Sequence, residues 1–257
     1  MQNLLTKPNA TDSSSVVSNR HHACPITPPQ DAGDDRHRCI VDYRREPFFV
    51  TWWGPPVYPD LRKFPALDCA QVSPVPLTPA LATIWKESAP LSYGSHASIR
   101  SHASVRTSGP SQFPISKLAH PDPQSLGLIE YEFRRLTDLK GLGLPIPDID
   151  PQPIVDGGRI HGYRMGLLGK LERWELHSRE QDILCALSEL HAAGFCHGDI
   201  TPGNIMKGRN DQIILIDFSF AGRIGSTVPP LIPDWVYAGG IFAAEDDLEA
   251  FHDFIAG

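Results

Sequence analysis

The stretch that decides the fold reads His197-Gly198-Asp199-Ile200-Thr201-Pro202-Gly203-Asn204-Ile205-Met206. After a polar turn over residues 207–211, the apolar run Ile213-Ile214-Leu215-Ile216 ends at Asp217-Phe218-Ser219. An apolar run of this length between turn residues predicts a buried strand, with Asp217 at its end. Asp and Asn are also common turn residues, so Asp199 and Asn204 taken singly are compatible with an ordinary turn.

A helix is predicted directly before this stretch, over residues 178–194. Ser178 followed by Gln181 is typical of a capping box, and Gly194 is a natural stop signal. The apolar stripe of this helix consists of Ile183, Leu184, Leu187 and Leu190. The 197–206 stretch therefore follows the end of a helix that packs on a core.

An earlier helix, predicted over residues 125–140, carries a charge on its apolar side. Leu128, Leu136 and Leu139 share one face, and Glu132 lies four residues from both Leu128 and Leu136. A buried carboxylate is costly unless a cation meets it. Glu132 is therefore expected to have a positively charged partner.

The order His-x-Asp, four residues, Asn, an apolar strand and Asp-Phe resembles the catalytic loop and metal-binding motif of protein kinases. This resemblance is specific within residues 197–219. It implies ATP and Mg²⁺ as cofactors, because Asp217 and Asn204 offer the hard oxygen ligands that magnesium prefers. It also implies that Asp199 accepts or orients the proton of the substrate hydroxyl, and that His197 braces the loop of this catalytic group.

The resemblance extends upstream to a lysine and a glutamate. Lys117, on a strand predicted at Phe113–Ala119, resembles the kinase lysine that holds the α- and β-phosphates. Glu132 resembles the helix glutamate that pairs with it, which would supply the missing cation. Glu130 is the competing carboxylate, although it falls off the apolar face. The alternative is that these are unrelated surface charges.

Three further segments resemble parts of a kinase less specifically. Gly94 is the one glycine of Tyr93–Ile99, a weak likeness to the glycine-rich loop that covers the phosphates. Residues 162–168 stand where the hinge that grips adenine is expected. Asp247 fits the buried aspartate that anchors the catalytic loop, although an acidic helix N-terminus, favoured by the helix dipole, explains it as well.

The chain also departs from the protein-kinase pattern. Gly198 replaces the usual arginine, and His-Gly-Asp is shared with phosphotransferases resembling the aminoglycoside and choline kinases. Thr201 replaces the typical lysine, and Ser219 replaces the glycine of Asp-Phe-Gly, which should stiffen that hinge. No Ala-Pro-Glu follows, and the chain ends soon after Asp247. In these respects it resembles short, truncated kinase-like proteins of a fungal type.

Composition places the chain among ordinary globular proteins. Of its 257 residues, 41% are hydrophobic and 21% are charged, with a net charge of −7. A negative charge argues against a broad nucleic-acid-binding face. No stretch approaches the length of a membrane span, and the start of the chain lacks the pattern of a secretory signal. We therefore expect a soluble, cytoplasmic protein without nucleic acid or membrane as partner.

We expect an α+β, two-lobed protein-kinase-like fold. Residues 1–40 are polar and without apolar periodicity, and are expected to be a disordered tail. Residues 41–89 form an extension of uncertain structure, in which residues 41–80 are expected to be extended and to pack onto something larger. The role of this extension cannot be read. Residues 90–168 are assigned to a β-rich N-lobe. Residues 169–257 are assigned to a mainly helical C-lobe, truncated after the helix that anchors the catalytic loop.

Three functions fit these residues. The leading one is an ATP-dependent kinase that transfers the γ-phosphate to a protein hydroxyl, of the Ser/Thr type, because of Asp199, Asn204 and Asp217. The second is a small-molecule kinase, because of Gly198 and the missing peptide-docking helices. The third is a non-catalytic nucleotide-binding protein, because of the degenerate glycine loop and the truncation.

Overall fold

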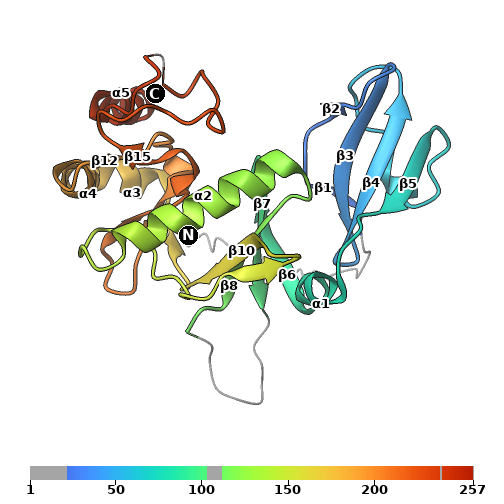
Figure 1. The fold of residues 1–257 in the computed structure, drawn as a ribbon, viewed down its shortest axis with the longest axis horizontal. Helices are drawn as coiled ribbons and strands as arrows, with labels where there is room; N and C mark the ends of the chain where they lie inside the picture. The colour runs from blue at the N-terminus through green and yellow to red at the C-terminus, as the bar shows by residue number, and fades with distance from the viewer. Residues whose placement is uncertain (1–21, 103–111, 238, 257) are drawn as a thin grey trace, which may run out of the picture.

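The computed structural model describes residues 22–102, 112–237 and 239–256. Its N-terminal part is rich in strands and its C-terminal part is mainly helical, as Figure 1 shows. This mixture is consistent with the kinase-like fold class predicted from the sequence. None of the helices within these ranges has the length and apolar character needed to cross a bilayer.

The N-terminal sheet is antiparallel, in the order β1-β3-β4-β5, with β2 also paired to β3. Its strands are β1 (Cys24–Pro25), β2 (Gln30–Asp31), β3 (Arg36–Tyr43), β4 (Glu46–Trp53) and β5 (Ala70–Pro74), and a short 3-10 helix, η1 (Leu61–Lys63), precedes β5. Alternate residues of the two long strands point to the same face. Cys39, Val41, Val50 and Trp52 are buried there and pack with Phe64.

The prediction that residues 1–40 are disordered is wrong for residues 22–40. These residues form β1, β2 and the first half of β3, while residues 1–21 lie outside the described ranges. The physical reason is that β3 pairs over eight residues with β4, so its partner comes from residues 46–53. The polar composition of residues 1–40 contains no signal for that pairing.

The central sheet follows in the chain and carries the upstream residues of the expected site. Its antiparallel order is β6-β7-β8-β10-β9. The strands are β6 (Ser88–Tyr93), β7 (Ala97–His102), β8 (Ile115–Ala119), β9 (Ile154–Asp156) and β10 (Arg159–Met165). The strand predicted at residues 113–119 corresponds to β8, and all five residues of β8 are buried.

Helix α2 (Pro123–Leu139) packs across the central sheet and confirms the helix predicted over residues 125–140. Asp122 caps its N-terminus through a hydrogen bond from the Ser125 N–H. Buried residues of α2 and of the central sheet join those of the helical part in one continuous hydrophobic cluster. The site therefore rests on a core shared by both parts of this region.

The C-terminal part contains three helices and several short strands. The helices are α3 (Arg173–Ser178), α4 (Glu180–Ala192) and α5 (Ala244–Ala256), with 3-10 helices η2 (Pro202–Asn204) and η3 (Phe218–Phe220). The strands are β11 (Gly169–Lys170), β12 (Phe195–Cys196), β13 (Ile205–Lys207), β14 (Ile213–Leu215) and β15 (Gly222–Arg223). Strands β11, β13 and β14 form one sheet, and β12 pairs with β15.

The predicted capping box at Ser178 is wrong. Ser178 is the last residue of α3, and its hydroxyl donates to the Glu175 carbonyl 3.1 Å away. Helix α4 begins after Arg179, without a side-chain cap. The capping contact belongs to α3, where the Glu172 N–H donates to Glu175 Oε2. The Ser178–Gln181 pattern therefore spans the junction of two helices and does not mark the start of one.

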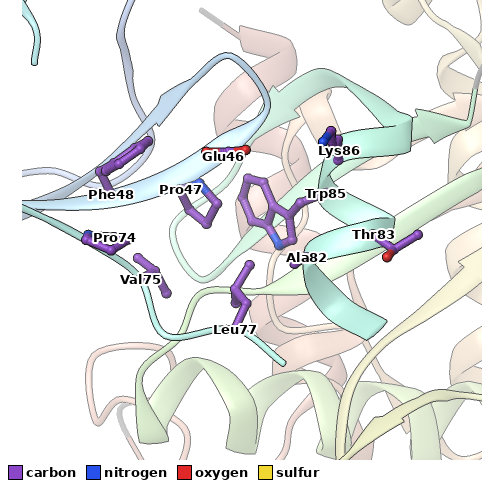
Figure 2. Close-up of a pocket in the computed structure, with 10 residues that line it drawn as sticks. All are labelled: Glu46, Pro47, Phe48, Pro74, Val75, Leu77, Ala82, Thr83, Trp85 and Lys86. Carbon is purple, nitrogen blue, oxygen red and sulfur yellow. The ribbon is translucent and has the colours of Figure 1, made fainter. Parts of the chain in front are cut away.

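A short helix, α1 (Pro79–Glu87), joins the N-terminal sheet to the central sheet. At this junction Arg100 of β7 is fully buried, and its Nη1 is 2.8 Å from Oδ2 of Asp42 in β3. The guanidinium lies 4.1 Å from the ring centre of Trp85. Trp85 also faces a cavity of about 390 Å³ between α1 and β4, beside Pro47, as Figure 2 shows.

Candidate active site

Lys117 of β8 and Glu132 of α2 meet in the interior. The Lys117 Nζ is 2.9 Å from Oε1 and 2.8 Å from Oε2 of Glu132, and both side chains are buried. The structure thus brings together the lysine and the glutamate that the sequence analysis paired. Glu130, the competing carboxylate, instead forms an ion pair with Arg134 at the surface of α2.

Glu132 is held by more than the lysine. Its Oε1 also accepts hydrogen bonds from the Phe218 N–H, at 3.1 Å, and from the Tyr163 hydroxyl, at 3.0 Å. Burial raises the pKa of Glu132, against the opposing effect of Lys117. Burial also disfavours the charge of Lys117, but the carboxylates of Asp217 and Glu132 raise its pKa above the ordinary value. Lys117 therefore remains a cation.

Asp217 lies just beyond β14 and contacts the same lysine. Its backbone is left-handed, with φ 67°, a conformation uncommon for residues with a side chain and typical of functional sites. Its Oδ1 is 2.8 Å from Lys117 Nζ and 2.6 Å from Ser219 Oγ. Burial disfavours its charge, but Lys117 outweighs this and holds the pKa of Asp217 well below its usual value.

The loop from His197 to Asn204 lies beside Asp217. Asn204 Nδ2 donates to both the carbonyl and Oδ2 of Asp199, at 2.8 and 2.9 Å. The carbonyl of Asn204 accepts from the Ile216 N–H at 2.9 Å, which ties the loop to the residue before Asp217. Burial, and next the charge of Asp217, raise the pKa of Asp199.

His197 is a bracing residue by its contacts. Its Nδ1 accepts from the Asp199 N–H at 3.2 Å, so the ring proton is on Nε2, which donates to the Ile216 carbonyl at 2.9 Å. The ring also lies 4.7 Å, centre to centre, from Phe218. Both of its nitrogens are occupied within the protein, which leaves neither for a substrate.

Asp247, in the first turn of α5, holds the start of the same loop. Its Oδ2 accepts from the His197 N–H and its Oδ1 from the Gly198 N–H, both at 2.7 Å. Its Oδ2 is also 2.8 Å from Nε2 of His191 in α4. The side chain is buried, and these contacts join α4, α5 and the loop at one carboxylate.

Gly198 stands where a protein kinase has arginine, and its surroundings explain the glycine. Its backbone is left-handed, with φ 80°. A Cβ at this position would overlap the Tyr237 hydroxyl and crowd the Phe220 carbonyl. Tyr237 donates from that hydroxyl to the Phe220 carbonyl at 3.0 Å. The Tyr237 hydroxyl therefore fills the space that a side chain at 198 would need, and a residue larger than glycine has no room there.

In the segment around Gly94, the side chain that reaches the candidate site belongs to His96. Gly94 forms an ordinary hairpin turn, since its N–H donates to the Ala97 carbonyl at 2.8 Å. The buried His96 of the same turn reaches the site, with Nε2 2.8 Å from Ser219 Oγ. Sequence reasoning missed both His96 and the contacts of Ser219. The available signal was the position of Ser219, directly after Asp217-Phe218.

A cavity of about 350 Å³ lies between the central sheet and the C-terminal part. Its lining residues are mostly apolar: Leu91, Ser92, Ile99, Ile115, Met165, Gly166, Leu167, Leu168, Lys170, Pro202, Gly203, Met206 and Ile216. Of the predicted hinge over residues 162–168, only the last four line this cavity. The first three belong to β10, where Gly162 is required because a Cβ would overlap the Lys117 carbonyl.

Two groups of side chains could hold a metal ion. His96, Glu132 and Asp217 place one ligand atom each within 4.8 Å of one another. However, the Lys117 ammonium already contacts both carboxylates, so one of their two negative charges is compensated within the protein. Asp217 Oδ2 accepts no hydrogen bond from the residues that the structure describes. Asp217 and the amide oxygen of Asn204 are the ligands expected from the sequence, and both offer the hard oxygen donors that suit magnesium.

Comparisons with known proteins agree with this geometry. Residues 134–224 match the model of a family described as the phosphotransferase enzyme family. A stretch of 129 residues, 48% of this chain, is 31% identical to a probable bifunctional tRNA threonylcarbamoyladenosine biosynthesis protein of Natronomonas pharaonis. That stretch spans only 23% of the archaeal protein. The resemblance to kinase-like phosphotransferases of the protein-kinase-like superfamily is therefore confirmed over the segment that contains Asp199, Asn204 and Asp217.

Proposed function

We propose that this chain transfers the γ-phosphate of ATP to a hydroxyl group, with Mg²⁺ as the metal cofactor. The main support is Lys117, which contacts Glu132 and Asp217 at once, beside the loop that presents Asp199 and Asn204. The match of residues 134–224 to a phosphotransferase family model supports the same class of reaction.

The cavity between the central sheet and the C-terminal part is the proposed adenine site. Ile99, Ile115 and Met206 supply apolar surface suited to a flat base. Lys117, at the centre of β8, is held by two carboxylates, so its ammonium is directed rather than free. We assign it to the phosphate oxygens of the nucleotide.

Asp217 and Asn204 are the proposed magnesium ligands. Bound magnesium neutralises the phosphate oxygens during transfer. The Asn204 amide nitrogen is directed at Asp199, which leaves its amide oxygen for the metal. The left-handed backbone of Asp217 and the hydrogen bonds on its Oδ1 orient Oδ2 for the same purpose.

Asp199 is the proposed base. Asn204 holds its Oδ2, and the other oxygen is assigned to the acceptor hydroxyl. The acceptor oxygen forms a bond to the γ-phosphorus while the bond to the β-phosphate oxygen breaks and ADP leaves. The hydroxyl proton passes to Asp199. The raised pKa of this carboxyl makes it a better proton acceptor than an exposed aspartate.

Phosphate transfer from labelled ATP to generic protein substrates tests the proposal. Asp199→Asn should reduce transfer by about a hundredfold or more while ATP binding persists. Lys117→Met should weaken ATP binding as well, because the phosphate contact is lost. Transfer that is equal in the wild type and in Asp199→Asn would contradict the assignment of the base.

A protein hydroxyl, of Ser or Thr, is the proposed acceptor. The support is the segment after Asp217, where Ile224, Trp235 and Ile241 are exposed. Trp235 packs on Phe220 and is two residues from Tyr237, whose hydroxyl abuts Gly198, so the segment that carries Trp235 contacts the start of the 197–204 loop. An exposed aromatic side chain on such a segment suits an extended polypeptide.

The choice of acceptor is tested with Trp235→Ala. Trp174→Ala is the matched control, because Trp174 is equally exposed, but on α3. We expect Trp235→Ala to raise the KM for protein substrates without changing ATP binding, and Trp174→Ala to change neither. Equal kinetics in the two variants would remove the support for a polypeptide acceptor.

A small-molecule hydroxyl is the second candidate. It is favoured by His-Gly-Asp and by the matched phosphotransferase family model. Coupled detection of ADP across a panel of hydroxylated metabolites separates it from the first. Turnover with a metabolite and none with proteins would favour this candidate.

A nucleotide-binding protein without turnover is the third candidate, favoured by the single glycine of the β6–β7 turn. Thermal stabilisation by Mg-ATP without transfer to any acceptor would support it. Autophosphorylation would exclude it.

A further inference from the structure

His96 brings the turn between β6 and β7 down onto the proposed metal site. Its side chain is buried, and its Nε2 is 2.8 Å from Ser219 Oγ and 3.9 Å from Asp217 Oδ1. Its carbonyl accepts from the His120 N–H at 2.9 Å, which fixes the backbone of the turn to the end of β8. The contact with Ser219 joins residues 123 positions apart in the chain.

The directions of these hydrogen bonds follow from the groups involved. Ser219 has one hydroxyl proton and two carboxylate contacts, Oδ1 of Asp217 at 2.6 Å and Oε2 of Glu132 at 3.2 Å, and carboxylate oxygens only accept. The shorter contact, with Asp217, takes the proton. Ser219 therefore donates to Asp217 and accepts from His96. His96 must then carry its proton on Nε2, and its Nδ1 accepts from Ser95 Oγ at 3.2 Å.

We infer that His96 and Ser219 are positioning residues that hold Asp217 ready for magnesium. Ser219 and Lys117 together occupy Oδ1, so Oδ2 is the oxygen presented to the metal. His96 holds the hydroxyl of Ser219 and thereby connects the β6–β7 turn to the proposed metal ligand. The inference rests on the proposed function, since it assumes that Asp217 binds the metal of Mg-ATP.

This arrangement gives the β6–β7 turn an anchor that does not depend on further glycines. A glycine-rich loop cradles phosphates through its backbone N–H groups. Here the N–H of Gly94 is used within the hairpin, and the turn is instead anchored by a side chain directed at Asp217. Ser219 likewise has a role that glycine at that position could not fill, because glycine has no hydroxyl.

Calorimetric titration of the full chain with ATP, in Mg²⁺ and in EDTA, tests the inference. The ratio of the two dissociation constants measures the contribution of the metal. Ser219→Ala and His96→Leu should each lower this ratio about tenfold, the effect of losing one hydrogen bond to a charged group or its support. His96→Gln, whose amide can donate in place of Nε2, should recover part of the ratio.

His120→Leu is the matched control, because His120 is also buried near the turn but has no side-chain contact with Asp217 or Ser219. It should leave the ratio unchanged. An unchanged ratio in Ser219→Ala and His96→Leu would overturn the inference. If both affinities for ATP also fall, by the same factor with and without metal, the two residues have a merely structural role. A wild-type chain whose ATP binding is independent of metal would instead overturn the proposed function.

Discussion

Gly198 is subject to two constraints, a left-handed backbone and a lack of space for a side chain. Alanine substitutions at Gly198 and Gly225 separate the two. Gly198 and Gly225 both have φ 80°, but a Cβ meets Tyr237 at the first and open space at the second. Gly225→Ala should cost about 1–2 kcal/mol, the price of a left-handed residue. Gly198→Ala should cost several kcal/mol more, because neighbouring atoms must move. Urea unfolding of both variants measures the difference, and equal losses would contradict the packing argument.

His96 and His120 make the fold sensitive to acid. Burial lowers the pKa of each imidazole from 6.5 to about 4. The unfolded chain therefore binds more protons than the folded chain between these values. Stability should be lost as the pH falls from 6.5 towards 4, by about 1.4 kcal/mol per pH unit for each histidine. Unfolding free energies measured across this range test the sign and the slope.

The His120→Leu substitution measures how much of this pH dependence of stability comes from His120. Neither ring nitrogen of this buried side chain has a hydrogen-bond partner among the described residues. His120→Leu should therefore reduce the pH dependence without loss of stability at pH 7, because it removes an unsatisfied polar group. The exposed His177 on α3 supplies the control, and His177→Leu should retain the wild-type slope. Identical slopes in all three proteins would contradict the assignment.

At the scale of elements, one ion pair joins β3 of the N-terminal sheet to β7 of the central sheet. Arg100 and Asp42 are both buried. Asp42→Asn should destabilise the protein by about 3–5 kcal/mol, since it leaves a buried guanidinium without its countercharge. The exposed pair Arg134–Glu130 is the control, and Glu130→Gln should cost less than about 1 kcal/mol. Similar losses of unfolding free energy for Asp42→Asn and Glu130→Gln in denaturant titrations would contradict the role given to burial.

The sequence predicted elements well where the signal is local. The helix with Glu132 and the strand before Asp217 were readable because apolar spacing and turn residues mark them. The start of α4 was misplaced, because the Ser178–Gln181 pattern resembles a capping box but spans the junction of α3 and α4 at Arg179. The strands within residues 22–40 were missed, since β3 depends on pairing with β4 rather than on its own composition. Extended structure was expected over residues 41–80, where β4 and β5 lie.

At the scale of the molecule, we expect that residues 90–257 do not fold without the residues before them. A fragment of residues 90–257, cut at the boundary predicted from the sequence, would lack Asp42, Trp85 and Ser88, all of which contact Arg100. We expect this fragment to be unfolded or insoluble. Circular dichroism and thermal unfolding of the fragment and of the full chain provide the comparison, and a cooperative transition near that of the full chain would contradict the prediction.

The candidate site was predictable in part, because several of its residues are close together in the sequence or carry a local signal. Asp199, Asn204 and Asp217 lie within nineteen positions, and Glu132 was identified by the need of a buried carboxylate for a cation. The contacts of His96 with Ser219 were not predictable. They join positions 123 residues apart, and neither side chain has a local pattern that requires the other.

The fit between Tyr237 and Gly198 also constrains how this protein can evolve. A lineage that moved from His-Gly-Asp to the His-Arg-Asp of protein kinases would need a smaller residue at 237 and a shift of the Phe220 carbonyl, because a side chain at 198 overlaps the phenol and crowds that carbonyl. Arginine at 198 beside an intact Tyr237 is expected to destabilise the fold. The two positions are therefore expected to change together, or not at all, among the descendants of this gene.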